Sequence, residues 1–186
     1  MKIKTRDMVL TSLFTALMVV GAFVKIPFPL VPLTFQTFFC AFAGIILGSR
    51  LGALSQILYL VMGLIGLPVF AYGGGISYIY NPTFGYVIGF VGAAFVIGKI
   101  TEKQRTLNFQ KALISVLSGL IIINLIGVPY FYFIKNVYLS QNLSVWYVIS
   151  AVFFPYFVKD LILYIIAAAT ASQVIPTLRR AGLKEI

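Results

Sequence analysis

The chain has 186 residues, of which 61% are hydrophobic and only 10% are charged. A soluble domain is roughly half apolar and about a quarter charged, so this composition predicts an integral membrane protein that forms a single domain over residues 1–186. With no histidine, one cysteine and four acidic residues, the sequence excludes a histidine-ligated metal and most hydrolytic chemistry. It also lacks a phosphate-binding loop, and we expect neither an enzyme nor a cofactor nor a metal site.

Apolar segments separated by charges, prolines and glycine clusters predict an all-α bundle of six membrane-spanning helices. A helix needs about 20 apolar residues to cross the hydrocarbon core of a bilayer. The first apolar segment is too long for the core of a secretory signal and lacks a cleavage motif, so we interpret it as a retained helix. The six predicted helices cover about residues 8–26, 33–49, 52–67, 83–99, 111–134 and 147–175.

The basic residues at the helix ends predict the orientation in the plasma membrane. Only Lys25 and Lys135 flank the helices on the side opposite the two termini. By the positive-inside rule, the termini are expected to be cytoplasmic in this multi-pass protein. Because the net charge of +10 is not gathered in one patch, we expect a lipid environment and no nucleic-acid partner. The basic residues on the termini side are Lys2, Lys4, Arg6, Arg50, Lys99, Lys103, Arg105, Lys111, Arg179, Arg180 and Lys184.

Small residues at a spacing of four predict faces on which helices pack closely in lipid. Ser12 and Ala16 form such a face on the first helix, which is otherwise simple and could therefore pack against another protein. The glycine-rich faces are interpreted as packing within the bundle. They comprise Gly44, Gly48 and Gly52, and Gly85, Gly89 and Ala93.

Two connections on the side opposite the termini, residues 25–39 and 66–86, are aromatic, rich in proline and poor in charge. Such loops are expected to fold over the bundle and cap a cavity. The second connection contains three consecutive glycines, which reach backbone conformations closed to other residues and can turn successive N–H groups toward an anion. An ordinary hairpin turn is the alternative interpretation. The three glycines are Gly73, Gly74 and Gly75.

Several uncharged polar residues lie near these connections. Asn81 precedes a proline and is either a residue of a helix N-terminus or an amide that contacts a ligand. Thr34, Gln36 and Thr37 offer further hydrogen-bonding groups near the top of the second helix. For Gln36, hydrogen bonding between helices is an equal alternative.

The last predicted helix carries the adjacent charges Lys159 and Asp160 in its middle. A charge at the membrane centre costs about 2.5–3.5 kcal/mol, and such residues commonly face a cavity or one another. Adjacent helical residues point about 100° apart, so we expect the two charges not to satisfy each other and to need other partners. A self-satisfied pair without a ligand is the alternative. Tyr156 and Tyr164 lie four residues to either side of Asp160 and extend its face.

Together these residues predict a mostly apolar pocket with a few placed polar groups in one half of the bundle. A ligand with an apolar body, amide-like hydrogen-bonding groups and an anionic tail would fit it. The aspartate would accept from N–H groups, the asparagine would donate to a carbonyl, and a lysine or backbone N–H groups would bind the anion.

Four segments, VPLTFQTFF, LYLVMGLIGLPVFAYGGG, NPTFGYVIGF and FFPYFVKDLILYIIAA, resemble the BioY family in order over about residues 8–175. Members of this family are the biotin-specific substrate-binding (S) components of energy-coupling factor (ECF) transporters. The resemblance implies a six-helix bundle that binds biotin in an outward-facing pocket and delivers it for uptake. It also implies three partner subunits, a transmembrane coupling protein and two ATP-binding-cassette ATPases.

The resemblance also implies how the ligand is held. The ureido ring of biotin would lie against Asp160 and Asn81, while Lys159 would stabilise the carboxylate or contact the ring. The glycine turn and nearby polar groups would bind the valerate carboxylate. The bicyclic ring would be surrounded by Tyr86, Tyr156 and Tyr164.

The first helix of the family carries an alanine-xxx-alanine docking face. Here Ser12 replaces the first alanine and Ala16 is retained, so the face remains small enough for close packing, and the departure from the family pattern concerns only the register of docking. Two other functions stay open, an S component for a different vitamin and a carrier that transports a small molecule without partner subunits.

Overall fold

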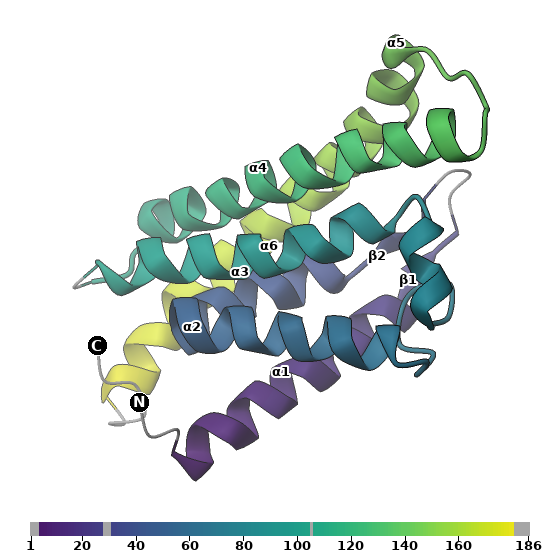
Figure 1. Cartoon of the computed structure of the whole chain (residues 1–186). Coiled ribbons are helices and arrows are strands. Elements are labelled where there is room, and N and C mark those ends of the chain that lie inside the picture. Colours follow the sequence, from purple (N-terminus) through teal and green to yellow (C-terminus); the bar gives the residue numbers. More distant parts are fainter. Residues whose placement is uncertain (1–3, 28–30, 105, 181–186) are drawn as a thin grey trace.

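The computed structural model describes residues 4–27, 31–104 and 106–180, with side chains as far as residue 177. Long helices run side by side and make up most of this part of the chain (Figure 1). The long helices are α1 (Thr5–Phe23), α2 (Gln36–Leu64), α3 (Phe84–Glu102), α4 (Phe109–Phe133) and α6 (Phe154–Arg180).

Short elements connect these helices at the end of the bundle where α1 ends. Strands β1 (Lys25–Ile26) and β2 (Leu33–Thr34) pair antiparallel, with Lys25 opposite Thr34. The remaining short elements are the 3-10 helix η1 (Ile76–Tyr80), the π-helical turns η2 (Ile134–Tyr138) and η3 (Ile149–Phe153), and α5 (Val145–Val148).

By length and composition, five helices of the described chain could cross a membrane, so the expected number of six is not confirmed. The difference lies in α2, which covers both the second and the third predicted helix. The five candidates are Thr5–Phe23, Gln36–Leu64, Phe84–Glu102, Phe109–Tyr138 and Val145–Thr177.

Helix α2 is broken at Gly48, whose backbone angles of φ +83° and ψ −176° are not helical. Nε2 of Gln36 donates to the hydroxyl of Tyr59 at 2.8 Å, whereas a straight helix would separate these residues by about 34 Å. The chain therefore reverses at Gly48, and α2 is a hairpin of two helical arms, residues 36–47 and 49–64. The sequence GSRLG marked this turn correctly, although both predicted helices extended beyond the arms.

Glu102 at the end of α3 holds the start of the second arm. Its Oε1 accepts from the backbone N–H of Ser49 at 2.6 Å and from the Ser49 hydroxyl at 3.0 Å. The carboxylate thus satisfies a backbone donor at a helix N-terminus, where negative charge is favourable. A Cβ on Gly48 would lie 2.5 Å from the same Oε1, so this position excludes a side chain on steric as well as conformational grounds.

We expect Gly48→Ala to lower the stability of the bundle by about 2 kcal/mol, because alanine is strained at this backbone conformation. The added methyl group would also displace Glu102 from Ser49. The measurement is the thermal unfolding midpoint of the purified, detergent-solubilised chain. Gly66→Ala is the matched control, because Gly66 also has a positive φ of +110° but has open space at its Cβ position. Equal losses in both variants would contradict a specific role for the Glu102 contact.

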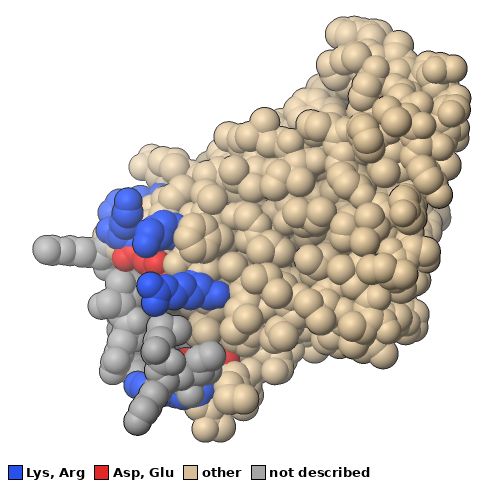
Figure 2. All heavy atoms as spheres, viewed as in Figure 1, with Lys and Arg blue, Asp and Glu red and all other residues tan. Residues whose placement is uncertain are grey.

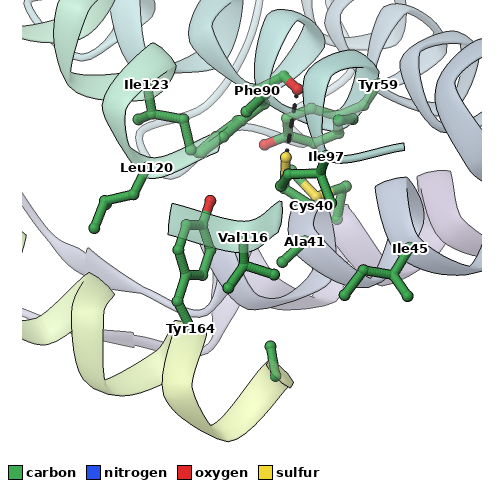
Figure 3. Packing of buried hydrophobic residues seen from close by; sticks show 14 of the residues in the cluster. Cys40, Ala41, Ile45, Tyr59, Phe90, Ile97, Val116, Leu120, Ile123 and Tyr164 are labelled. Carbon is green, nitrogen blue, oxygen red and sulfur yellow. Dashed lines mark hydrogen bonds between the residues drawn. The ribbon is translucent and has the colours of Figure 1, made fainter. Parts of the chain in front are cut away.

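Close approach of glycines to neighbouring helices shapes the interior. A Cβ on Gly44 would lie 2.8 Å from the carbonyl oxygen of Ala94 on α3, and one on Gly89 would lie 3.0 Å from Cα of Ile123 on α4. The expectation that the glycine faces pack within the bundle is confirmed at these positions. Between the helices lies a core of fully or almost fully buried side chains (Figure 3), including Cys40, Ala41, Ile45, Tyr59, Phe90, Ile97, Val116, Leu120, Ile123 and Tyr164.

Charged side chains gather at the end of the bundle where α1 begins and α3 ends (Figure 2). Most of the lysine and arginine side chains in the described chain lie there, at the helix ends and next to the Gly48 turn. Lys25 and Lys135 lie toward the opposite end, after α1 and after α4. The asymmetry predicted from the sequence is therefore present in the fold.

Candidate ligand-binding site

A small cavity lies between the helices at the end of the bundle opposite the basic end. Its volume of about 50 Å³ is enough for a few water molecules. A bicyclic ligand therefore requires its walls to move outward. The cavity is lined by Val31, Pro32, Thr34, Gln36, Thr37, Ala71, Tyr78, Thr83, Tyr86, Val87, Phe90, Ile123, Tyr156, Lys159 and Asp160.

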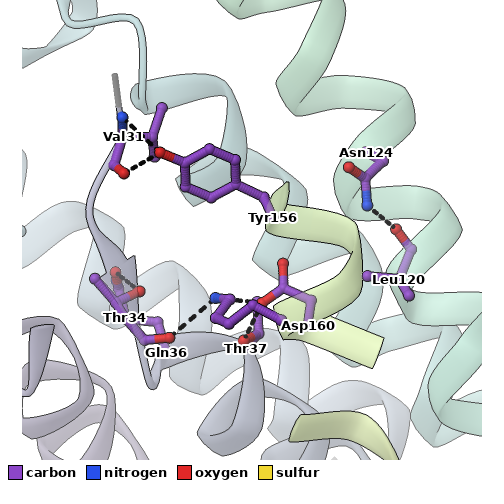
Figure 4. Close-up of polar contacts among 9 residues, drawn as sticks. Val31, Thr34, Gln36, Thr37, Leu120, Asn124, Tyr156 and Asp160 are labelled. Atoms are coloured by element: carbon purple, nitrogen blue, oxygen red, sulfur yellow. Dashed lines mark hydrogen bonds and ion pairs between the residues drawn. The ribbon is translucent and has the colours of Figure 1, made fainter. Parts of the chain in front are cut away.

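Asp160 is the buried anion of this cavity, with 6% of the residue exposed. Its Oδ1 accepts a hydrogen bond from the Thr37 hydroxyl at 2.8 Å and forms an ion pair with Nζ of Lys159 (Figure 4). Nζ of Lys159 also donates to the carbonyl oxygen of Thr34 at 3.1 Å. The expectation that these neighbouring charges could not satisfy each other was wrong, because the lysine side chain is long enough to fold back onto the adjacent carboxylate.

Gln36 and Thr34 line the cavity, but their polar groups also connect parts of the protein. The hydroxyl of Thr34 donates to Oε1 of Gln36 at 3.0 Å, and the Gln36 amide donates to Tyr59. The Tyr59 hydroxyl donates in turn to the carbonyl oxygen of Val69 at 3.0 Å. This chain of bonds links β2, both arms of α2 and the following loop, so the helix-linking interpretation of Gln36 describes contacts that are present.

The three predicted tyrosines have different positions. Tyr156 lines the cavity, and its hydroxyl accepts from the backbone N–H of Val31 at 2.8 Å and donates to the Val31 carbonyl oxygen. Tyr86 also lines the cavity, and its buried hydroxyl has no hydrogen-bond partner in the described chain. Tyr164 is fully buried and is absent from the cavity lining, because it lies one helical turn, about 6 Å, beyond Asp160.

Asn81 supports a wall of the cavity without being one of its lining residues. Its Oδ1 accepts from the backbone N–H of Thr83 at 2.9 Å and from the Thr83 hydroxyl at 2.8 Å. Thr83 does line the cavity, together with Tyr78, whose hydroxyl lies 2.9 Å from that of Thr83. Burial raises the pKa of the Tyr78 phenol, which therefore stays neutral at physiological pH.

The glycine triplet forms a packed turn beside the cavity. Gly73 and Gly75 have φ of +111° and +102°, which explains the need for glycine. The N–H of Gly73 donates to Phe70 at 3.2 Å, and the N–H of Gly75 donates to Gly63 at 2.7 Å. A Cβ on Gly74 would lie within the backbone of Leu67. This arrangement favours the hairpin alternative, since the two bonded N–H groups are not directed at an anion.

Sequence reasoning missed several lining residues. Tyr78 and Thr83 lie in the aromatic connection that was expected to cap a cavity. The composition of this segment therefore indicated the cavity, although nothing in the sequence distinguished these two residues within it. Val31, Pro32 and Ala71 also lie in the two connections that were expected to cap a cavity. Among the helix residues, Val87, Phe90 and Ile123 had no signal that distinguished them from the rest of the core.

Ser12 and Ala16 lie on the outer surface of α1 and line an apolar groove of about 670 Å³ between α1 and the second arm of α2. Thr15, on the same helix, donates to the carbonyl oxygen of Ser55 at 3.0 Å and fixes α1 against that arm. Both Ser12 and Ala16 are exposed in the chain alone. The groove is completed by Val19, Val20, Leu58, Met62 and Val69.

The fold and this site define a multi-pass membrane protein with a small-molecule cavity between its helices. The sequence profile of the BioY family matches residues 1–180. The chain therefore belongs to the BioY family.

Curated relatives agree with this assignment, and a solved structure shares the fold. A probable biotin transporter BioY of Lysinibacillus sphaericus is 43% identical over 177 residues, which are 95% of this chain and 90% of that protein. The biotin transporter BioY of Thermotoga maritima is 40% identical over 89% of this chain and 94% of its own length. A crystal structure of the S-component for biotin from an ECF-type ABC transporter superposes with a TM-score of 0.55 at 24% identity. It covers 94% of this chain and 91% of that one, and shows that the fold is shared.

Proposed function

We propose that this chain is the biotin-binding S component of an ECF-type vitamin transporter. It binds biotin in a pocket between its helices and delivers the vitamin for uptake without breaking any of its bonds. The observation that carries this proposal is the buried Asp160, placed with Lys159 and Thr37 in the cavity of a chain whose relatives are named biotin transporters. Residues 1–186 are proposed to act together as one substrate-binding domain.

The chemistry of the cavity suits a cyclic urea. The Asp160 carboxylate can accept from the ureido N–H groups, and a charged acceptor gives stronger hydrogen bonds than a neutral one. Lys159 forms an ion pair with this carboxylate and so balances its charge inside the bundle. The hydroxyl of Tyr86, buried without a partner in the described chain, can donate to the ureido oxygen. Asn81 is proposed to act through Thr83, which it orients at the cavity wall.

We further propose that the bundle spans the membrane six times, with each arm of α2 as one short span. The basic end, which includes the Gly48 turn, would face the cytoplasm together with both chain termini. The cavity would then open outward, beneath the connections that follow α1 and α2. The support for this orientation is the separation of the basic end from the cavity end of the bundle.

The groove at Ser12 and Ala16 is proposed as the docking surface for a transmembrane coupling protein, which two ATP-binding-cassette ATPases would drive. Ser12 and Ala16 in this groove are small and exposed, so a partner helix could approach them closely in lipid. The groove lies on α1, on the outside of the bundle, so a docked helix would leave the cavity unobstructed.

The experiment that tests the ligand is titration calorimetry of the purified chain, stripped of endogenous biotin, against biotin and a panel of other vitamins. We expect one biotin to bind per chain, and none of the other vitamins to compete. Tight binding of another vitamin, with none of biotin, would replace biotin as the ligand. Uptake by lipid vesicles that contain this chain alone would instead support the self-sufficient carrier.

A further inference from the structure

We infer that Lys25, at the rim of the cavity, is the cation that binds the carboxylate of the ligand. The inference rests on the proposed function, since it concerns the anionic tail of biotin. It assigns a role in ligand specificity to a residue that the sequence pattern explained only as a topological charge.

The glycine turn is poorly suited to bind this carboxylate. The N–H groups of Gly73 and Gly75 donate to carbonyl oxygens of the protein at 3.2 and 2.7 Å. An anion could use them only after these bonds were broken, and a buried carbonyl left unpaired costs free energy. The turn therefore shapes the rim without supplying free donors at these two positions.

Lys159 is also poorly suited, because its charge is already used. It forms the ion pair with Asp160 and donates to the carbonyl oxygen of Thr34. A ligand carboxylate placed there would lie next to the buried Asp160, and two carboxylates at close range repel each other. The anionic tail of the ligand is therefore expected to point away from Asp160 and toward the rim.

Lys25 lies at the rim between two lining residues of the cavity. In the β1–β2 pair it is directly opposite Thr34, so the two side chains project from the same face of the ribbon. Its Nζ donates to the carbonyl oxygen of Ala71 at 2.5 Å. Thr34 and Ala71 both line the cavity. The ammonium group thus lies beside two lining residues and links β1 to the second connection.

The surroundings leave Lys25 able to bind an anion. Its Nζ also lies 5.4 Å from the ring centre of Tyr72, which orients the ammonium without neutralising it. The residue is exposed, and an ammonium has three donors, so one carbonyl contact leaves capacity for a carboxylate. Lys135, the other lysine toward this end, lies over the Phe131 ring on α4, and neither residue lines the cavity.

The test compares biotin with biotinamide, in which the carboxylate is replaced by a neutral amide. We expect the wild-type chain to bind biotin more tightly than biotinamide, and Lys25→Gln to reduce this preference about fivefold, as for a strong exposed ion pair. Lys25→Arg should retain the preference, and Lys135→Gln is the matched control. The preference should also weaken with rising salt, because the rim is exposed to solvent.

The ratio of the affinities for biotin and biotinamide distinguishes recognition of the ligand's charge by Lys25 from a structural role of this residue. Loss of the bond between Lys25 and Ala71 could weaken both ligands equally, and this would leave the ratio unchanged. An unchanged ratio in Lys25→Gln, with biotin still bound by the wild type, would overturn the inference and keep the proposed function. A folded wild-type chain that binds neither compound would overturn biotin as the ligand, and the role of Lys25 with it.

Discussion

Asp160→Asn is expected to weaken biotin binding by about 10- to 100-fold, the loss typical of a charge-assisted hydrogen bond. The variant replaces the carboxylate by a neutral amide, which keeps one acceptor oxygen and puts an NH₂ donor in place of the other. It also leaves Lys159 without its ion-pair partner. Titration calorimetry of the purified, biotin-free variant measures the effect, and thermal unfolding shows whether the bundle remains folded.

Two further variants make this result specific. Asp7→Asn makes the same chemical change at the start of α1, remote from the cavity, and should leave biotin affinity unchanged. Thr37→Val removes the hydroxyl that donates to Asp160 and should weaken binding about threefold to tenfold, because it acts on the ligand only through the carboxylate that it orients. If Asp160→Asn bound biotin as tightly as the wild type, Asp160 would have a structural role, and the ligand would lie elsewhere in the cavity.

Ala16→Phe is expected to abolish biotin uptake by the complete transporter while leaving biotin binding to the isolated chain intact. The phenyl ring would fill the groove between α1 and the second arm of α2, where close packing with a partner helix needs a small residue. Uptake of labelled biotin by cells that produce this chain with an ECF module measures the first effect. Calorimetry on the purified chain measures the second.

Leu13→Phe provides the control for this docking surface. Leu13 lies on the same helix with 51% of the residue exposed, but it is not one of the groove residues. Its substitution should leave uptake unchanged, and so should Ser12→Ala, because serine and alanine are both small. Normal uptake by Ala16→Phe would move the docking surface to another face of the bundle.

Much of the fold could be predicted because membrane helices are long and apolar, and because charged residues, prolines and glycine clusters separate them. The predicted boundaries for α1, α3 and α4 differ from the structure by three residues or fewer. The hairpin within α2 was harder to predict, since a single glycine with a positive φ reverses the chain without a loop. Hydropathy alone does not indicate such a turn. The basic residue in the sequence GSRLG does indicate it.

The candidate site could be predicted in part. Asp160 and Lys159 carried a signal, because charges are rare in membrane helices, and both line the cavity. Helical periodicity could not show that Tyr164 lies a turn too deep, because it gives the direction of a side chain and not the depth of the cavity. Whether the Gly75 N–H is free likewise could not be predicted, because it donates to the carbonyl oxygen of Gly63, which lies outside the local turn.

The packing below the cavity has a consequence for how cargo leaves the protein. Tyr164, Cys40 and Ile97 are fully buried on three different helices beneath Asp160, and they seal the described bundle with tightly packed side chains. A bicyclic molecule could pass through this floor only if the helices separated and lost the contacts of the core. If the cavity faces outward, as proposed above, cargo would leave by the side from which it entered. Delivery to the cytoplasm would then require the loaded cavity itself to change its orientation in the membrane, with the helices below it kept packed.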